Sequence, residues 1–412
     1  MSRLGAGRYP TNAEMPAATT TSVHQLTTSD GARVPGVLRN IPGATTVAVL
    51  MHPRQDLTHH GLIPYLVREG YAVWAQQPRS VNNDIALLHE QAILDAAAGH
   101  QFLRRHFENV VTVGHSGGGT LSALYHQQAN CDPDDRISTT ASGRPVPMAD
   151  VDLPAPDGAI FLAPHPGQGQ LLARLIDPSV VDENDPLSRD PDLDPYSPEN
   201  GFDPEPGHTR YAPDFVARYR EAQLARIERI DRAAWEADSA TRRARETAFH
   251  SGLLRDRQAA LAPRIVTVYR TDADLRSVDL TLDPNERKYG SLFGNRPDLT
   301  NYGLVGFGRL STPGAWLSTW SLNHTRADFV RCAPGVTAPT LFLELTGDQA
   351  CFPQDVQRMT AALASSDLTT GQIRGTHFGA PLHPEDPSGY ELAAERMAEW
   401  LGQRYGARSA IT

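Results

Sequence analysis

Residues 110–120 read VVTVGHSGGGT, and this stretch decides the fold. Its β-branched run predicts a buried strand, and the residues after it fit a helix, so strand, tight turn and helix surround a Gly-x-Ser-x-Gly pattern centred on Ser116. Small residues at such a turn let strand and helix approach closely and lift the serine hydroxyl into solvent: Gly114, Gly117 and Gly118. Ser116 is therefore a candidate nucleophile. The alternative is a glycine-rich turn without chemistry, as in a phosphate-binding loop.

The length and charge of the chain argue against several classes of protein. Its 412 residues suffice for one large α/β domain with an insertion, or for two domains. The formal net charge of −10 and the lack of a clustered basic face argue against nucleic acid as a partner. No apolar run approaches the length of a membrane span, and residues 1–22 are polar without the pattern of a secretion signal. We therefore expect a cytoplasmic protein with a flexible N-terminus over residues 1–22 and no membrane contact.

The cysteines indicate neither a disulfide framework nor a metal site. Cys131, Cys332 and Cys351 are odd in number, widely spaced and without the paired spacing of metal ligands. No other motif implies a bound group, so the sequence predicts neither a metal nor a cofactor.

Predicted strands and helices alternate on both sides of the Ser116 turn. Residues 21–28 and 33–38 flank a turn and predict an antiparallel hairpin. The later strands are continuously apolar, as expected of strands covered on both faces. The further strands are expected at residues 46–51, 71–75, 158–163, 339–345 and 368–373, and the helices at 62–69, 85–107, 353–364 and 390–405. This alternation predicts a largely parallel sheet, with ligands at the carboxyl ends of its strands.

The alternation stops in a long insertion at residues 166–335. Residues 176–207 are dense in Asp, Glu and Pro and predict a loop, whereas residues 214–261 are rich in arginine and have a helical period. Residues 264–269 resemble a further strand. We expect this segment to form a cap over the active face of a core made of residues 23–165 and 336–412.

A base and an orienting carboxylate are needed before a serine hydroxyl can act as a nucleophile near neutral pH. Asp348 follows the strand at 339–345 in a Gly-Asp turn, and His377 directly follows the last strand. Because the carboxyl ends of parallel strands meet at one edge of a sheet, both side chains should lie beside Ser116. Glu344 is a weaker rival for the acid because it lies inside the strand. Asp348 could alternatively be a helix-cap residue, and His377 an ordinary loop histidine.

These three residues resemble the catalytic residues of the α/β-hydrolase superfamily, which follow in the order Ser, Asp or Glu, His. Ser116, Asp348 and His377 match that order one by one, and the insertion stands where the family has its variable lid. The resemblance covers about the first 165 residues and the last 75. It implies an α/β-hydrolase fold with a mostly parallel central sheet, helices on both faces and a large inserted cap.

Backbone amides beside the nucleophile should stabilise the negative charge that develops on a substrate oxygen. In the family, one amide belongs to the residue after the serine, which here is Gly117. Another lies just beyond a His-Gly pair, but this chain has His52-Pro53, and proline has no amide hydrogen. The resemblance therefore implies an oxyanion hole formed by the amides of Gly117 and Arg54.

Side chains at the strand ends suggest substrate contacts. Arg54 and Arg79 follow neighbouring strands and could clamp a carboxylate or another polar acceptor, although surface ion pairing explains them equally well. The remaining candidates lie at the ends of other strands or next to the predicted catalytic histidine: His52, His115, His165 and Phe378.

The sequence thus predicts a serine hydrolase that cleaves a carboxylic ester or lactone of a small to medium organic molecule. Ser116 attacks, His377 transfers the proton and Asp348 orients the imidazole. Amide hydrolysis, hydrolysis of a carbon–carbon bond in a diketone, and acyl transfer need the same triad and remain open. A catalytically silent ligand-binding protein is the alternative of a different class, and the intact Ser, Asp and His argue against it. The oligomeric state is left open.

Overall fold

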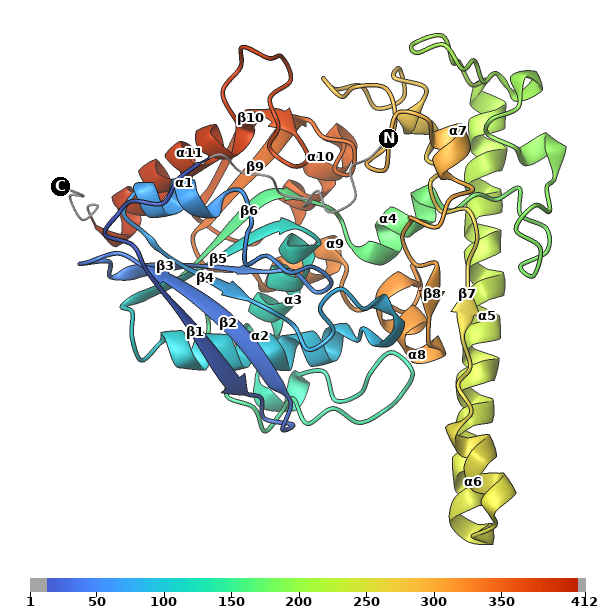
Figure 1. Ribbon diagram of the computed structural model, residues 1–412, viewed down its shortest axis with the longest axis horizontal. Helices are drawn as coiled ribbons and strands as arrows, with labels where there is room; N and C mark the ends of the chain where they lie inside the picture. Colours follow the sequence, from blue (N-terminus) through green and yellow to red (C-terminus); the bar gives the residue numbers. More distant parts are fainter. Residues whose placement is uncertain (1–12, 407–412) are drawn as a thin grey trace.

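The computed structural model describes residues 13–406, which fold around an eight-stranded sheet (Figure 1). The strand order is β1-β2-β4-β3-β5-β6-β9-β10. β2 pairs antiparallel with β1 and β4, and every pairing from β4 to β10 is parallel. The strands are β1 (Thr20–Thr27), β2 (Arg33–Asn40), β3 (Thr46–Met51), β4 (Ala72–Gln76), β5 (Asn109–Ser116), β6 (Gly158–Pro164), β9 (Thr340–Gly347) and β10 (Leu368–Thr376). The predicted hairpin and parallel sheet are confirmed.

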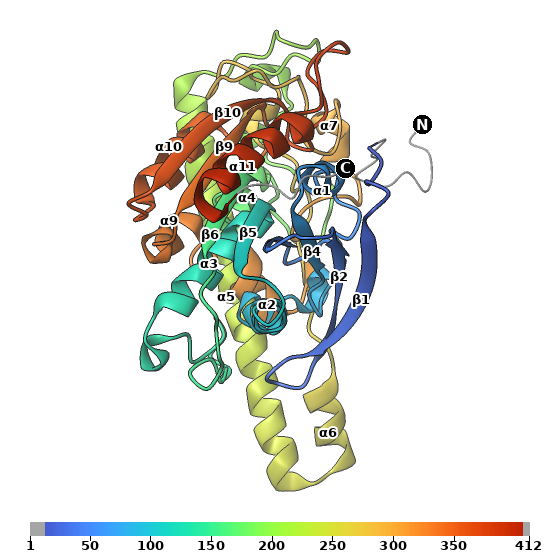
Figure 2. The same ribbon diagram turned by 90° about the vertical axis from the view of Figure 1, so that its left-hand side faces the viewer.

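Helices cover both faces of this sheet, which explains why its inner strands are apolar along their length. β3, β4 and β6 are buried at every position. Buried clusters join one face to α1 and α11 and the other face to α2, α3 and α10, and Figure 2 shows these layers from the side. The helices are α1 (Ile63–Arg68), α2 (His89–Leu103), α3 (Gly117–Asn130), α10 (Pro353–Ala362) and α11 (Gly389–Tyr405).

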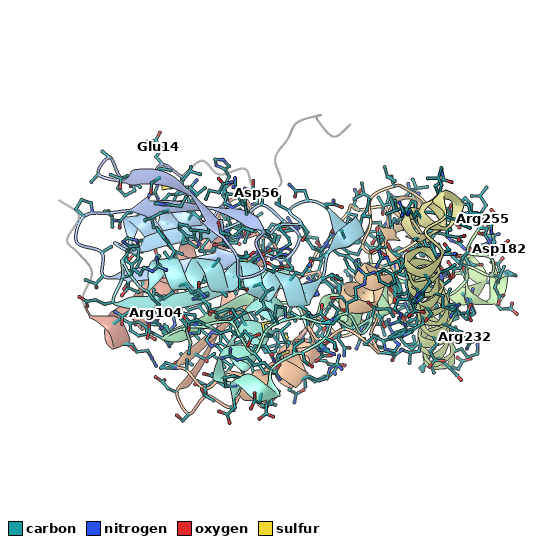
Figure 3. The ribbon with its side chains drawn as sticks, turned by 90° about the horizontal axis from the view of Figure 1, so that it is seen from below. Glu14, Asp56, Arg104, Asp182, Arg232 and Arg255 are labelled. Carbon is teal, nitrogen blue, oxygen red and sulfur yellow. The ribbon has the colours of Figure 1, made fainter. Side chains whose placement is uncertain are left out.

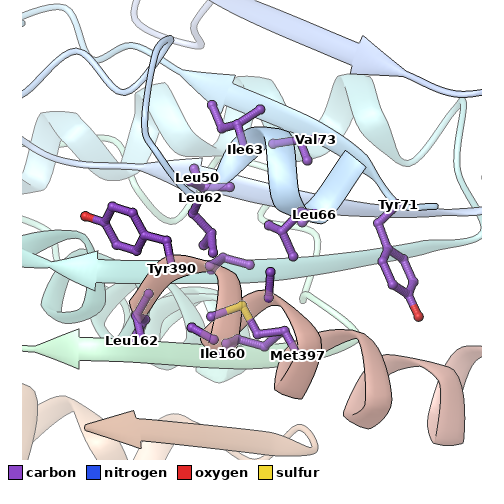
Figure 4. Close-up of a cluster of buried hydrophobic side chains, with 14 of the residues drawn as sticks. Leu50, Leu62, Ile63, Leu66, Tyr71, Val73, Ile160, Leu162, Tyr390 and Met397 are labelled. Carbon is purple, nitrogen blue, oxygen red and sulfur yellow. The ribbon is translucent and has the colours of Figure 1, made fainter. Parts of the chain in front are cut away.

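The cluster beneath α1 and α11 shows how the strands are held (Figure 4). Leu50 of β3 and Ile160 of β6 project from the strands on either side of β5, and Leu66 of α1 and Met397 of α11 pack in the same cluster. Burying one such side chain contributes about 1.5–3 kcal/mol to folding. This layer therefore fixes the strands whose carboxyl ends carry the candidate site.

The insertion is built around α5 (Pro213–Ser251), a helix of 39 residues. α5 stands beside the core and, together with α6 (Leu254–Leu261), projects beyond it (Figures 1 and 2). Gly252 ends α5 with a φ of 65°, a conformation that favours glycine, and α6 folds back against α5. The helical stretch expected at residues 214–261 is therefore two helices. This tip exposes four large apolar side chains, Phe249, Leu253, Leu254 and Leu261.

The acidic stretch at residues 176–207 forms a loop with two short 3₁₀ turns, as predicted. The loop is tied to α5 by an ion pair. The buried guanidinium of Arg226 donates two hydrogen bonds to Glu183, at 2.8 and 2.6 Å. Figure 3 shows Asp182 of this loop on the same part of the molecule as Arg232 and Arg255, with Arg104 on the core.

Short elements complete the insertion and the loops. These are α4 (Gln168–Leu175), β7 (Val266–Thr267), α7 (Pro297–Thr300), β8 (Leu310–Ser311), α8 (Pro313–Ala315), α9 (Phe329–Cys332), the π-helical turn η6 (Trp316–Trp320), and the 3₁₀ turns η1 (Asp84–Ala86), η2 (Pro133–Asp135), η3 (Pro191–Leu193), η4 (Pro198–Asn200), η5 (Leu275–Ser277) and η7 (Ala333–Gly335). α9 packs into the core, where the Phe329 and Phe161 rings meet edge to face at 4.8 Å. The last part of the predicted cap therefore packs with the core.

Several predicted boundaries are wrong. α2 starts at His89 because residues 84–86 form a separate 3₁₀ turn instead of the first turn of the expected helix. The strand expected at 264–269 is only two residues long and pairs with β8. Residue 20, expected to be flexible, and residues 21–22, which the expected flexible segment shared with the predicted hairpin, belong to β1, whose ladder with β2 begins at Thr20. Residues 1–12 of that predicted flexible segment lie outside the described residues.

Cys131, Cys332 and Cys351 are free thiols. Between residues 13 and 406, no helix combines the length and the apolar character that a membrane crossing requires.

Candidate active site

Ser116 occupies a strained turn between β5 and α3. Its φ of 55° and ψ of −128° are costly for a residue with a side chain, and such strain is typical of a nucleophile turn. The neighbouring glycines are required sterically. A Cβ on Gly114 would lie 2.5 Å from Gly119 Cα, and a Cβ on Gly118 would lie 2.4 Å from the Met51 carbonyl oxygen. The turn thus holds Ser116 half-buried at the carboxyl edge of the sheet.

Ser116, His377 and Asp348 form a continuous hydrogen-bonded chain. His377 Nε2 lies 2.9 Å from Ser116 Oγ, and His377 Nδ1 lies 2.9 Å from each carboxylate oxygen of Asp348. His377 follows β10 and Asp348 follows β9, so adjacent parallel strands deliver both side chains to the edge where β5 ends. A carboxylate at Nδ1 places the ring proton there and leaves Nε2 to accept the serine proton.

The insertion helps to fix the turn that carries Asp348. The carboxylate accepts hydrogen bonds from the amides of Ala350 (2.6 Å) and Cys351 (3.0 Å). From the insertion, Asn285 Nδ2 donates to the Asp348 carbonyl at 2.8 Å, and the Glu286 amide donates to the Thr346 carbonyl at 2.9 Å. Glu344, the rival acid, is paired instead with Gln372.

Three features together decide the architecture. They are the strand order, the position of the Ser116 turn directly after β5, and the positions of Asp348 after β9 and His377 after β10. The chain has the α/β-hydrolase fold. No protein-family model matches the sequence, and no curated protein matches it either.

Solved structures resemble this chain at low sequence identity. The alpha/beta hydrolase GrgF from a Penicillium species is 11% identical with a TM-score of 0.47, and covers 93% of this chain and 98% of its own. A hypothetical protein of Pseudomonas aeruginosa is 11% identical with a TM-score of 0.45, over 98% and 99%. An esterase of Pyrococcus furiosus is 10% identical with a TM-score of 0.42, over 96% and 98%. The fold assignment rests on the strand order and the turn.

The two amides expected to form the oxyanion hole, those of Gly117 and Arg54, have different surroundings in the structure. Gly117 is the first residue of α3, where backbone amides have no acceptor within the helix. The Arg54 amide instead donates to the ring nitrogen His52 Nδ1 at 3.0 Å, and the Gln55 amide donates to the same nitrogen at 3.1 Å. The prediction that the Arg54 amide is free to bind an oxyanion is therefore corrected, because a nearby side chain already accepts it.

The predicted carboxylate clamp is also corrected, because the α/β-hydrolase core pairs both guanidinium groups internally. Arg54 donates two hydrogen bonds to Asp84, at 2.7 and 2.5 Å. Arg79 is held by Asp95 and Asp30, at 2.7 and 2.6 Å. Neither arginine offers an unpaired charge to a substrate.

His115 does not line a substrate site but lies buried behind His377. Its Nε2 donates to the His377 carbonyl at 2.8 Å, and its Nδ1 accepts from His60 Nε2 at 3.1 Å. His60 Nδ1 in turn accepts from the Leu62 amide at 3.2 Å. Burial lowers the pKa of His60 to about 3 and that of His115 well below its usual range, so both rings are neutral. His115 therefore supports the loop of His377.

His52 and His165 both point at Gly117, and the structure adds Gln168, which sequence reasoning missed. A Cβ on Gly117 would lie within 2.9 Å of one side-chain nitrogen from each of the three residues. Gln168 is the first residue of the helix that follows β6. The signal in the sequence that could have pointed to Gln168 is its position three residues after His165. Phe378 meets the His377 ring edge to face at 4.9 Å and remains a predicted lining residue.

Proposed function

We propose that the protein is a serine hydrolase that cleaves a carboxylic ester or lactone of a small to medium organic molecule. The observation that carries the proposal is the unbroken chain of 2.9 Å contacts from Ser116 Oγ through His377 to Asp348, at a strained turn in front of a helix. The insertion, which is hydrogen-bonded to the Asp348 turn, would act as the cap.

The reaction follows from the positions of the protons. His377 Nε2 takes the proton of Ser116 Oγ as the oxygen attacks the ester carbon, and Asp348 stabilises the imidazolium that forms. The Gly117 amide and the positive end of α3 stabilise the negative oxygen. His377 then gives the proton to the departing alcohol. Water, deprotonated by the same nitrogen, attacks the acyl-enzyme, and His377 returns that proton to Ser116 Oγ as the bond from the serine to the acyl group breaks and the carboxylic acid leaves.

Hydrolysis of p-nitrophenyl esters of increasing acyl length tests this function. We expect turnover with an optimum set by the space under the cap, and a loss of at least about 10³-fold in the Ser116→Ala variant. Ser122→Ala is the matched control, because Ser122 lies on the same helix α3 and its hydroxyl has no hydrogen-bond partner among residues 13–406. It should keep wild-type turnover.

A fluorophosphonate probe separates the enzyme from a silent binding protein. Labelling of the wild type and of Ser122→Ala, but not of Ser116→Ala, requires an activated serine at residue 116. Absence of both labelling and ester turnover in a folded protein would refute the proposal. Labelling without turnover of simple esters would redirect the search to lactones, diketones, amides and acyl acceptors.

A further inference from the structure

The far end of the insertion is a narrow helical tip that stands clear of the core. This hairpin tip comprises residues 241–265, which are the last turns of α5, the turn at Gly252, α6 and the short segment after it. Two perpendicular views show it projecting beyond the sheet and the helices that cover the sheet (Figures 1 and 2). The hairpin tip is therefore a convex surface that another body can reach.

Apolar side chains are exposed on both helices of the hairpin tip. Phe249 is 85% exposed, Leu254 71% and Leu261 83%. In α6, Leu254 and Leu261 are seven residues apart and so share one face. Ala260, the buried residue of α6, lies on a different face, and α6 packs along α5. Single exposed apolar residues are ordinary on protein surfaces, but several gathered at one projecting end indicate an interaction site.

Arginines surround these apolar side chains. Residues 241–265 contain six arginines and two acidic residues, Glu246 and Asp256, although the whole chain has a formal net charge of −10. The arginines are Arg242, Arg243, Arg245, Arg255, Arg257 and Arg264, and all six are exposed. Figure 3 labels Arg255 on α6. The hairpin tip is therefore positively charged on an otherwise acidic protein.

Most of these arginines are not neutralised by the protein itself. Arg242 pairs with Asp238 at 3.5 Å, and Arg255 pairs with Asp256 at 3.6 Å. The other four guanidinium groups form no ion pair with any residue between 13 and 406; they belong to Arg243, Arg245, Arg257 and Arg264. A guanidinium group binds phosphate through two parallel N–H donors. Four positive charges are thus available to an anionic partner.

We propose that the hairpin tip binds the surface of an anionic phospholipid membrane. The side chains of Phe249, Leu254 and Leu261 enter the boundary between the headgroups and the acyl chains, and the arginines bind the lipid phosphates and other anionic headgroup oxygens. The carbon stems of the arginines lie along the acyl boundary while their guanidinium groups stay in the headgroup layer. The binding goes beyond the proposed hydrolase activity, because it uses no residue of the proposed triad.

This mode of binding needs no membrane-spanning helix, and the described residues contain none. The lack of a spanning segment, on which the expectation of no membrane contact rests, does not bear on a basic tip that lies in the plane of the interface. The exposed hairpin tip therefore replaces that expectation with contact at the membrane surface.

The shape and charge of the hairpin tip favour a lipid surface over a macromolecular partner. A second copy that met the same tip across a two-fold axis would bring the arginines of both copies together. A stable protein interface buries about 800 Å² on each partner with matching shape, whereas this tip is a narrow projecting end (Figure 2). Nucleic acid would leave the apolar side chains in water. A fluid anionic membrane accepts a convex apolar end and supplies negative charge at the same place.

Co-sedimentation of the full-length chain with lipid vesicles tests the proposal. Vesicles of phosphatidylcholine with about one phosphatidylserine in three should bind the wild type at least roughly tenfold more tightly than pure phosphatidylcholine, and added salt should weaken this preference by screening the arginines. The triple variant Phe249→Ser, Leu254→Ser, Leu261→Ser should bind anionic vesicles roughly 100-fold more weakly or worse. The double variant Arg245→Gln, Arg257→Gln should bind them roughly 10- to 30-fold more weakly.

Matched substitutions elsewhere on the insertion serve as controls. Leu187 is 72% exposed on the acidic loop, and Arg218 is exposed near the start of α5. Leu187→Ser and Arg218→Gln should leave vesicle binding unchanged. All variants should keep the wild-type far-UV circular dichroism, because every replaced side chain is exposed. Ser116→Ala should bind vesicles like the wild type, which makes this test independent of the proposed function.

Three outcomes overturn the proposal. The first is no binding to anionic vesicles at low salt, or equal binding to both kinds of vesicle. The second is a loss in Leu187→Ser as large as that in the triple variant. The third is a wild-type dimer in sedimentation equilibrium that the triple variant dissociates, without vesicle binding, because a second copy then covers the hairpin tip. Selective vesicle binding without any Ser116-dependent turnover or fluorophosphonate labelling refutes the proposed function alone.

Discussion

Replacing His115 by phenylalanine tests whether a buried histidine positions the proposed catalytic base. The ring of His115 connects His60 to the backbone of His377 through two hydrogen bonds, of 3.1 and 2.8 Å. Phenylalanine fills a similar volume next to Phe378 and Tyr390 but offers neither a donor nor an acceptor. The substitution therefore removes both hydrogen bonds with little change in packing.

The expected loss of stability in His115→Phe follows from the two hydrogen-bonding groups that lose their partner. The His60 N–H loses its His115 acceptor inside the protein, at a cost of about 1–3 kcal/mol, and the His377 carbonyl loses a donor, at a cost of about 1 kcal/mol. We expect the free energy of unfolding to fall by about 2–4 kcal/mol. If the His377 loop then shifts by a few tenths of an ångström, kcat should fall roughly 10- to 100-fold, because near-attack geometry is lost, while KM changes little.

Urea unfolding and steady-state ester hydrolysis measure the two effects in the same preparations. His126→Phe is the control, because His126 is also fully buried and bonded to Thr112 at 2.9 Å, but contacts no member of the triad. It should lose stability while its folded fraction keeps the wild-type kcat. A wild-type kcat in His115→Phe, or an equal loss in His126→Phe, would show that the His60–His115 pair does not position His377.

Three further predictions concern the proposed triad, Gly117 and pH. Asp348→Asn should lower kcat about 10³- to 10⁴-fold in ester hydrolysis, because an amide cannot stabilise the His377 imidazolium; a loss below tenfold would contradict the role of the acid. Gly117→Ala should lower kcat/KM by about 10²-fold, because its Cβ would displace three polar side chains that lie within 2.9 Å, and unchanged kinetics would contradict that convergence. Acid should unfold the protein. Burial lowers the pKa of six histidines below the ordinary 6.5, so below that pH the unfolded chain binds more protons than the folded chain. These histidines are His60, His89, His100, His115, His126 and His165. At pH 5 a ring whose folded-state pKa is about 3 or 4 lowers the free energy of unfolding by about 2 kcal/mol, so the urea midpoint should fall steeply from pH 6.5 to 5, and a constant midpoint would refute the neutral, buried state of these rings.

The parts of the site that the sequence predicts are those fixed by local chain geometry. Ser116 is defined by a strand, a glycine-rich turn and a helix that are contiguous in the chain, and Asp348 and His377 each directly follow a strand. Once the sheet is parallel, the carboxyl ends of these strands must meet at one edge. The structure accordingly brings together three residues that are up to 261 positions apart.

The parts that sequence reasoning misplaced depend on partners far away in the chain. His115 lies at the end of β5 and was expected to face the substrate, but His60 and the His377 backbone hold it in the interior. The Arg54 amide was expected in the oxyanion hole, but the side chain of His52 accepts it. Polar groups satisfy their hydrogen bonds wherever the fold places a partner, and no local pattern encodes that choice.

The insertion does more than cover the core, because it also forms hydrogen bonds to residues that surround the candidate site. It bonds to the Asp348 turn through Asn285, and Ser318 holds His89 through both the backbone amide and the ring of that residue. The buried Arg276 of the insertion also reaches Asp355 at the start of α10, directly after the Asp348 turn. The acid of the proposed triad is thus positioned partly by the insertion. Substitutions in this part of the insertion should therefore change kcat through Asp348, whereas substitutions in a mobile lid would mainly change substrate entry.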